Sequence, residues 1–344
     1  MKAEFSGKIK YFGFIMTCGM VLYHCPVIDS IPAVSSLDLS LKTLTDSVFR
    51  SSVNLIMCYF FAVTGFLLFQ DFSLKKYPSK IKRRVFSLLI PYVLWQVIAA
   101  LIEILTTECE MTLVDFLNRT FLLYAWPVDA PLWYVYAVFL LALVSPLLLL
   151  LLKRKNISWA ILFVVFFLCS QLSRLTIPSL QKIFFHGYVA NIIVDLPAYL
   201  AGAFYGYHHK DASPACLSYI LLAQLPAFLL NERFDGFFAY VTMALLPLAL
   251  LYIIPPVRIL ENRKIYRLSF LMYALHRPLY ELFWPELLSL YTHSLGRIIT
   301  SAAVASVLTR FFALAGITGL CALLYFILSR LAPRLLSLLT GGRA

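Results

Sequence analysis

Two histidines of this chain lie inside long apolar segments, where an ionisable side chain is costly and therefore points to function. His24 ends the run Leu22-Tyr23-His24, and His276 lies within Tyr273-Ala274-Leu275-His276-Arg277-Pro278. A neutral imidazole accepts a proton near pH 7 and can act as a general base toward a hydroxyl group. The alternative is a packing histidine that is hydrogen-bonded to a neighbouring helix.

Other polar side chains accompany His276. Tyr273 precedes it by three residues and so shares its face of a helix, and Arg277 follows it directly. These side chains could line a cavity or form a polar clamp between helices. Asp195 and Glu281 are predicted to be buried carboxylates that orient a histidine or pair with Arg277.

The segments that hold these residues must lie in lipid. The chain has 344 residues, of which 61% are hydrophobic and 13% charged, whereas a soluble domain has about 25% charged residues. A helix needs roughly 20 apolar residues to cross the hydrocarbon. We therefore predict an all-α integral membrane protein with a single domain over residues 1–344. It would be a bundle of about ten transmembrane helices. The predicted spans are 9–28, 51–71, 85–107, 131–152, 157–174, 188–207, 214–231, 237–254, 267–286 and 299–331.

The net charge of +12 follows the expected topology rather than a nucleic-acid surface. Lysine and arginine gather in alternate connections and at both ends of the chain, while the other connections hold acids. This pattern predicts that both termini are cytoplasmic, in a multi-pass protein of the inner (cytoplasmic) membrane. It also predicts outward-facing loops over Ile28–Arg50 and Glu108–Ala130. The cysteines are scattered and His208 and His209 are adjacent, so we expect no metal site.

Ordered motifs resemble the membrane-bound acyltransferase-3 family, which moves acyl groups onto sugars and other hydroxyl-bearing acceptors. They are Met20-Val21-Leu22-Tyr23-His24, Phe60-Phe61-Ala62-Val63-Thr64-Gly65-Phe66-Leu67-Leu68, Lys82-Arg83-Arg84 with Leu88-Leu89-Ile90-Pro91-Tyr92-Val93-Leu94-Trp95, Pro131-Leu132-Trp133-Tyr134-Val135-Tyr136 and, more weakly, Ser269–Pro278. One departure concerns the arginine that the family has eleven positions before the first histidine, where this chain has Gly13. Lys10 lies nearly one helical turn away and could offer a charge to the same face.

The resemblance implies roles for these residues. His24 would be the general base, and Arg83 and Arg84 would bind the phosphates of acetyl-coenzyme A arriving from the cytoplasm, although basic residues at a helix end also anchor to lipid headgroups. Lys10 would belong to the donor site. So would Thr64, which stands at a position where the family has Ser. Trp133 and Tyr134 would form a platform for the sugar or acyl chain, or an aromatic belt.

The resemblance also implies the partners. The acceptor would be a hydroxyl group of a surface or lipid-linked glycan. Acyl-coenzyme A would be a substrate rather than a bound cofactor. The accessory groups would be His276, Tyr273, Arg277, Asp195 and Glu281. One rival function is a non-enzymatic glycan transporter or exporter on the same scaffold. A binding or sensory membrane protein is another.

Overall fold

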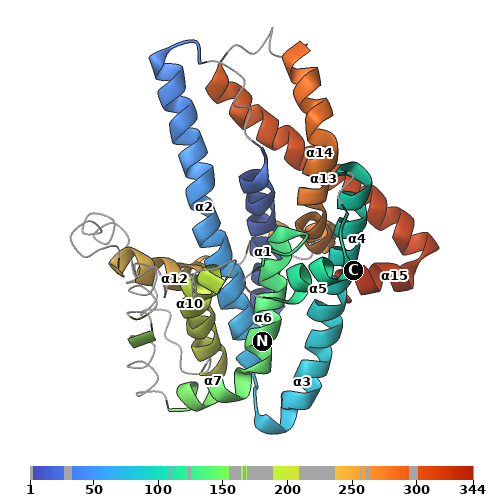
Figure 1. Cartoon of the computed structure of the whole chain (residues 1–344). Coiled ribbons are helices and arrows are strands. Elements are labelled where there is room, and N and C mark those ends of the chain that lie inside the picture. The colour runs from blue at the N-terminus through green and yellow to red at the C-terminus, as the bar shows by residue number, and fades with distance from the viewer. Residues whose placement is uncertain are drawn as a thin grey trace.

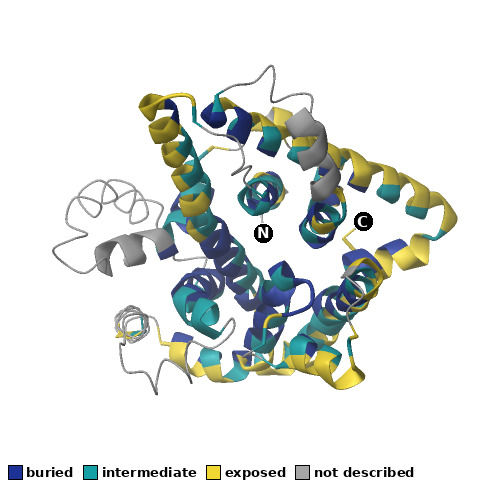
Figure 2. Ribbon diagram, turned by 45° about the horizontal axis from the view of Figure 1, so that its top comes forward, coloured by how far each residue is buried: buried dark blue, intermediate teal, exposed yellow. Residues whose placement is uncertain are grey.

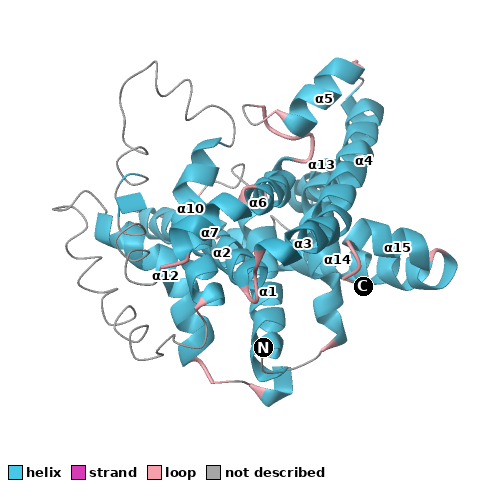
Figure 3. Ribbon diagram, turned by 90° about the horizontal axis from the view of Figure 1, so that it is seen from below, coloured by secondary structure: helices cyan, strands magenta, loops and turns pink. Residues whose placement is uncertain are grey.

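Every described element of the computed structural model is helical (Figure 3). The structure describes residues 3–26, 33–107, 110–122, 125–154, 164–165, 168, 189–208, 237–255, 257–260, 263–293 and 301–343. The α-helices are α1 (Ala3–His24), α2 (Ser36–Phe69), α3 (Tyr77–Arg84), α4 (Ile90–Thr107), α5 (Leu113–Phe121), α6 (Trp133–Leu143), α7 (Ser145–Leu152), α10 (Val189–Tyr207), α12 (Phe237–Ile253), α13 (Ser269–His293), α14 (Ala302–Leu331) and α15 (Pro333–Thr340).

Four of the described helical stretches are long and apolar enough to cross a membrane. They are Ser36–Phe69, Leu74–Thr106, Val189–Tyr207 and Ala302–Leu331. The pair Ala130–Leu143 and Ser145–Leu152, bent by 66°, would make a fifth. Buried residues line the inner faces of the bundle, whereas α14 and α15 expose much of their outer surface (Figure 2). An exposed apolar surface of this kind suits a protein that is solvated by lipid.

Two predicted loops contain helices instead. The predicted loop at 28–50 is wrong from Ser36 onward, because α2 begins there and runs unbroken to Phe69 (Figure 1). Ser35 caps this helix by accepting a hydrogen bond from the Asp38 amide at 3.1 Å. The loop predicted at 108–130 contains α5, which begins with a capping box between Thr112 and Asp115. The spans predicted at 157–174 and 214–231 fall almost wholly outside the described residues.

Prolines set two breaks in the helices. The span predicted at 131–152 bends at Val144, directly before Ser145 and Pro146, because proline cannot continue the hydrogen-bond ladder of the preceding helix. In the stretch from α3 to α4, the π-helical segment η2 (Val85–Leu89) precedes Ile90 and Pro91. Such π-helical turns occur where a helix must change its register.

Backbone contact between α2 and α10 organises the centre of the bundle. Any side chain at Gly65 would overlap the backbone of Tyr199. In the same way, a side chain at Gly202 would overlap the backbone of Ala62, and a side chain at Gly206 would overlap the backbone of Phe66. Small residues four apart, such as Gly202 and Gly206, let membrane helices approach this closely. The two helices therefore hold one another without intervening side chains.

A second tie joins the far half of α2 to α14. The Asp38 carboxylate accepts hydrogen bonds from the Ala302 and Ala303 amides at 2.9 and 3.2 Å, which caps α14. Asp46, expected in a loop, forms an ion pair with the buried Arg310 at 2.9 Å. The Arg310 guanidinium also lies 4.6 Å from the centre of the Phe49 ring. Removing one partner would leave an unpaired buried charge, so this pair fixes how α2 and α14 align.

Glycine at 202 is predicted to be required for this packing. Gly202→Ala should force α2 and α10 apart and lower the melting temperature of the detergent-solubilised protein, because overpacking typically costs about 1–3 kcal/mol. Gly316→Ala is the matched control, since nothing lies within 4 Å of the added methyl group there. Equal melting temperatures for the two variants would contradict the close helix contact.

Candidate active site

The two intramembrane histidines lie against each other. Their ring centres are 5.0 Å apart, His24 at the end of α1 and His276 on α13. His276 is fully buried and His24 half-buried. The Tyr280 hydroxyl donates to the Val21 carbonyl at 2.9 Å and so ties α13 to the last turn of α1. Residues far apart in the sequence thus form one imidazole pair.

The hydrogen bonds of His276 define its tautomer. Its Nδ1 lies 2.7 Å from the Tyr273 carbonyl oxygen and 3.3 Å from that of Met272. A carbonyl oxygen only accepts, so Nδ1 carries the hydrogen and the neutral ring has a lone pair on Nε2. This Nε2 is buried and has no hydrogen-bond partner among the described residues. His276 therefore presents a free acceptor inside the bundle.

A cavity of about 230 Å³ adjoins the pair. Its walls combine His24 with the carboxyl-bearing Asp195, two asparagines and several aromatic side chains. The lining residues are Met20, Tyr23, His24, Val53, Asn54, Met57, Trp126, Ala130, Pro131, Trp133, Asn191, Val194, Asp195 and Tyr273. Few polar groups set among apolar and aromatic walls are typical of small-molecule sites.

A row of side chains leads from the histidines into the bundle. The Tyr273 ring centre lies 6.1 Å from that of His276 and 6.4 Å from that of Tyr134. The Tyr273 hydroxyl donates to the Pro131 carbonyl. The Tyr134 hydroxyl donates to the Phe60 carbonyl at 2.9 Å, so the Thr64 hydroxyl, 2.6 Å away, is the donor to Tyr134.

The aromatic-belt alternative is wrong for Trp133, which is 7% exposed and packs against Phe61 with ring centres 5.9 Å apart. Tyr134 is half-buried among the helices. Trp133 lines the cavity, and Tyr134 lies one position further along, toward Thr64.

The predicted basic residues separate into inner and outer positions. Arg84 is half-buried and lies close enough to Tyr134 and Tyr199 to interact electrostatically, whereas Arg83 is exposed. Lys10 is exposed as well and does not join the site. The buried lysine of α1 is Lys8, whose Nζ donates to the Leu251 carbonyl at 3.0 Å. The helix α1 thus turns Lys8 inward and Lys10 outward, because residues two apart do not share a face.

The predicted carboxylates also differ from one another. Asp195 is buried and accepts a weak hydrogen bond from the Cys58 thiol at 3.9 Å. The prediction that Glu281 is buried is wrong, because its side chain is 53% exposed. It pairs with Arg277 at 2.8 Å on the same helix, so this pair does not clamp two helices together. Exposed pairs of this kind contribute little stability, about 0–1 kcal/mol.

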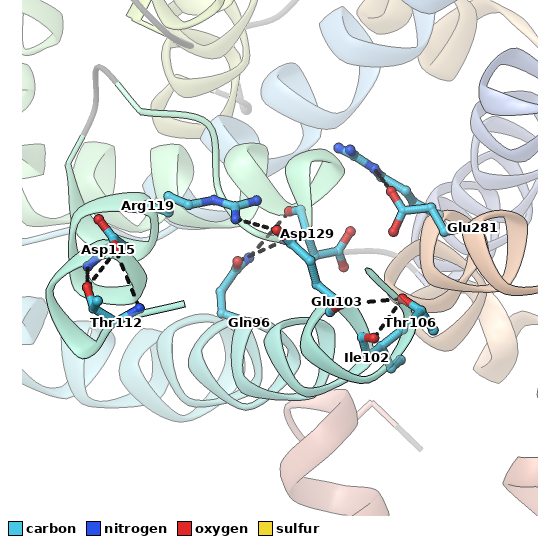
Figure 4. Close-up of polar contacts among 10 residues, drawn as sticks. Gln96, Ile102, Glu103, Thr106, Thr112, Asp115, Arg119, Asp129 and Glu281 are labelled. Carbon is cyan, nitrogen blue, oxygen red and sulfur yellow. Dashed lines mark hydrogen bonds and ion pairs between the residues drawn. The ribbon is translucent and has the colours of Figure 1, made fainter. Parts of the chain in front are cut away.

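Asp129, which sequence reasoning missed, is the most unusual carboxyl group of the region. It is 2% exposed, and neither oxygen has a hydrogen-bond partner among the described residues. The Gln96 amide holds its backbone, accepting from the Asp129 N–H at 3.0 Å and donating to its carbonyl at 3.3 Å (Figure 4). Asp129 lies between Gln96 and Glu281 in this view. Burial raises the pKa of the Asp129 carboxyl well above its usual range.

The apolar helices and the cavity lined by His24 define a helical membrane protein with a candidate small-molecule site. The chain belongs to the acyltransferase-3 family, because the model of that acyltransferase domain matches residues 9–326. It is therefore an acyltransferase. It is similar to the succinoglycan biosynthesis protein ExoH of Rhizobium meliloti (strain 1021), with 26% identity over 377 aligned positions that cover all of this chain and 94% of the relative. No solved structure matches it.

Asp129 should make stability depend on pH. A carboxyl whose pKa is raised in the folded state binds its proton more tightly there, so stability falls as pH rises above the unfolded value of about 3.9. Asp129→Asn removes the titrating carboxyl group, and with it the fall in stability at higher pH. The variant should melt a few degrees higher than the parent at pH ~8, and the difference should shrink at pH ~5. If the difference in melting temperature between variant and parent is the same at both pH values, the carboxyl does not titrate in this way.

Proposed function

We propose that this acyltransferase moves an acetyl group from acetyl-coenzyme A to a hydroxyl group of a surface or lipid-linked glycan, with His24 as the general base. The observation that supports this most directly is the contact between the His24 and His276 rings beside the cavity. A base must lie within hydrogen-bond reach of the proton that it removes. His24 is the half-buried member of the pair and lines the cavity, so an acceptor hydroxyl group can reach it.

The proposed reaction conserves the proton. His24 takes the proton of the acceptor hydroxyl group as its oxygen attacks the thioester carbonyl carbon. The carbon–sulfur bond then breaks, and the leaving thiolate recovers the proton from the His24 imidazolium. His276 is a positioning residue in this scheme. Its free Nε2 would accept a hydrogen bond from the His24 ring and stabilise that ring while it is charged.

The donor is proposed to approach from the opposite end of the row of side chains. Arg84 lies beside Tyr134, and Tyr134, Tyr273 and His276 follow one another by ring contacts. A guanidinium group binds phosphate well. The nucleotide would therefore stay near Arg84 while the thioester end extends along Tyr134 and Tyr273 toward His24.

The proposed glycan acceptor has two supports. The relative that this chain resembles is named for succinoglycan biosynthesis. The cavity also offers Tyr23, Trp126 and Trp133 as flat apolar walls, with Asn54 and Asn191 to bond hydroxyl groups. Sites for whole drug-sized ligands reach about 300–1,000 Å³. A cavity of about 230 Å³ suits one sugar hydroxyl with its surroundings.

The proposed arrangement in the membrane has about ten spans, with both termini in the cytoplasm and the protein in the inner membrane. It is supported by the alternation of basic and acidic connections. The exposed positions Lys82 and Asp115 are predicted to lie on opposite sides. In a cysteine-free background, an impermeant thiol reagent should label Asp115→Cys in intact cells, and Lys82→Cys only after permeabilisation. Labelling in the reverse order would contradict the orientation.

His24 is predicted to be essential for transfer. Because a general base contributes typically about 10²–10⁴-fold to rate, His24→Ala and His24→Gln should abolish transfer of labelled acetyl groups per molecule of monodisperse protein. His276→Ala should retain more activity, as expected of a positioning residue.

His208→Ala is the matched control. The His208 ring contacts the Leu152 carbonyl. It lies beyond the end of α10, about 20 Å along the helix from Asp195. The variant should transfer at the rate of the parent. Transfer at that rate by folded His24→Ala protein would refute the proposed base.

A further inference from the structure

The C-terminal end of the chain brings a second arginine to Arg84. Arg343, which follows α15, lies close enough to Arg84 for the two positive charges to repel, and both act electrostatically on Tyr134. Arg343 lies beyond residues 9–326, which the family model matches. Two guanidinium groups from distant parts of the sequence therefore lie near the same phenol.

Specific contacts hold the C-terminal end in this position. The Trp95 indole donates to the Leu339 carbonyl at 2.9 Å, which fastens α15 to α4. Gly341 has φ of +62°, and a side chain there would overlap the backbone of Ser87 in the π-helical segment η2. Only glycine combines that conformation with so close an approach. The final turn thus contacts η2, the segment that directly follows Arg84.

The position of the Arg343 guanidinium is also fixed. It donates to the Thr340 carbonyl at 3.0 Å and lies 4.6 Å from the centre of the Phe270 ring on α13. A cation over an aromatic face is attracted by the ring. Arg343 therefore contacts its own helix end and α13.

The charge of this arrangement is not balanced within the described part of the chain. Arg84 makes no hydrogen bond or ion pair with any described residue. Arg343 uses its guanidinium for the one bond to Thr340. Arg343 is an exposed residue, and both guanidinium groups are cations at neutral pH because arginine stays protonated in proteins. Each guanidinium has five N–H donors, and most of these are unused.

We propose that Arg84 and Arg343 form a two-arginine site for a phosphate-bearing ligand, to which the C-terminal segment contributes the second cation. Two neighbouring guanidinium groups can bind the oxygens of a phosphate or diphosphate, which would remove their mutual repulsion. Resting on the proposed function, the ligand is the nucleotide end of the acyl donor. The same chemistry would also suit a lipid headgroup.

The test measures coenzyme A and pyrophosphate binding to the purified full-length protein in nanodiscs, by calorimetry, at fixed salt concentration. Arg343→Gln and Arg84→Gln should each weaken binding about tenfold or more, since charge-assisted hydrogen bonds are among the strongest. Arg343→Lys should recover part of the affinity, because lysine keeps the charge but loses the planar fork. A purely structural role for Arg343 would give no such partial recovery.

The matched control is Arg334→Gln on α15, whose side chain is exposed. It should bind like the parent. If Arg343→Gln also binds like the parent, with no loss of co-purified anionic lipid, the two-arginine site is refuted. If coenzyme A binding is unchanged but retention of anionic lipid falls, the ligand is a headgroup and the nucleotide assignment is overturned.

Failure of the proposed donor would give a different result. Pyrophosphate would then bind in an Arg343-dependent manner while coenzyme A did not, which would support the site and reject the acyl-coenzyme A donor. A parent protein that binds neither ligand and retains no anionic lipid would refute the site itself.

Discussion

The direct backbone contact between α2 and α10 is the constraint on which the rest of the bundle depends. Where Gly202 meets Ala62 and Gly206 meets Phe66, no side chain separates the helices. Most interhelical contacts can adjust by changing rotamers, but a contact between backbones cannot. The contact therefore fixes the relative position of Thr64 on α2 and Asp195 on α10, one facing Tyr134 and the other the cavity. The chemistry of the protein is arranged around this rigid pair.

The polar groups of the bundle differ in how well they are satisfied. Asp46 and Arg310 form an ion pair between α2 and α14, although the Arg310 Nε has no hydrogen-bond partner among the described residues. Lys8 bonds to the Leu251 carbonyl. These contacts are structural. By contrast, the Nε2 of His276 and the Asp129 carboxyl have no hydrogen-bond partner among the described residues, although they are buried. Because an unsatisfied buried polar group costs roughly 1–3 kcal/mol, groups of the second kind are the ones that a substrate or a proton would complete.

The groups proposed to take part in the reaction are distributed along the bundle. His24 and His276 lie at the cavity, with Tyr273 and Tyr134 behind them, and Arg84 lies at the far end of the row. The proposed transfer, from a phosphate-bearing donor to an acceptor on the other side of a membrane, would need this separation of binding from chemistry. Each end would then be exposed to its own compartment while the reacting atoms meet between helices. The side chains of the row would position the donor and exclude water.

The sequence alone determined the class of protein and singled out His24 as the candidate base. Apolar length and the placement of charge indicated a helical membrane protein, and the ordered motifs around His24, Thr64 and Trp133 indicated the acyltransferase family that the comparison confirms. Helical spacing also correctly predicted that the Tyr273 and His276 side chains lie close together. These features are local, since composition and a period of 3.6 residues are properties of one segment at a time.

Only the tertiary structure decided which segments meet. It paired His24 with His276, separated Arg84 from Arg83, turned Lys10 and Glu281 outward, and brought Arg343 from the C-terminal end to Arg84. It also buried Asp129, which the sequence shows only as an acid between two apolar segments. A helical period specifies which side chains share a face but not which neighbour that face contacts. The neighbour is chosen by packing over the whole bundle, such as the fit of Gly202 against Ala62.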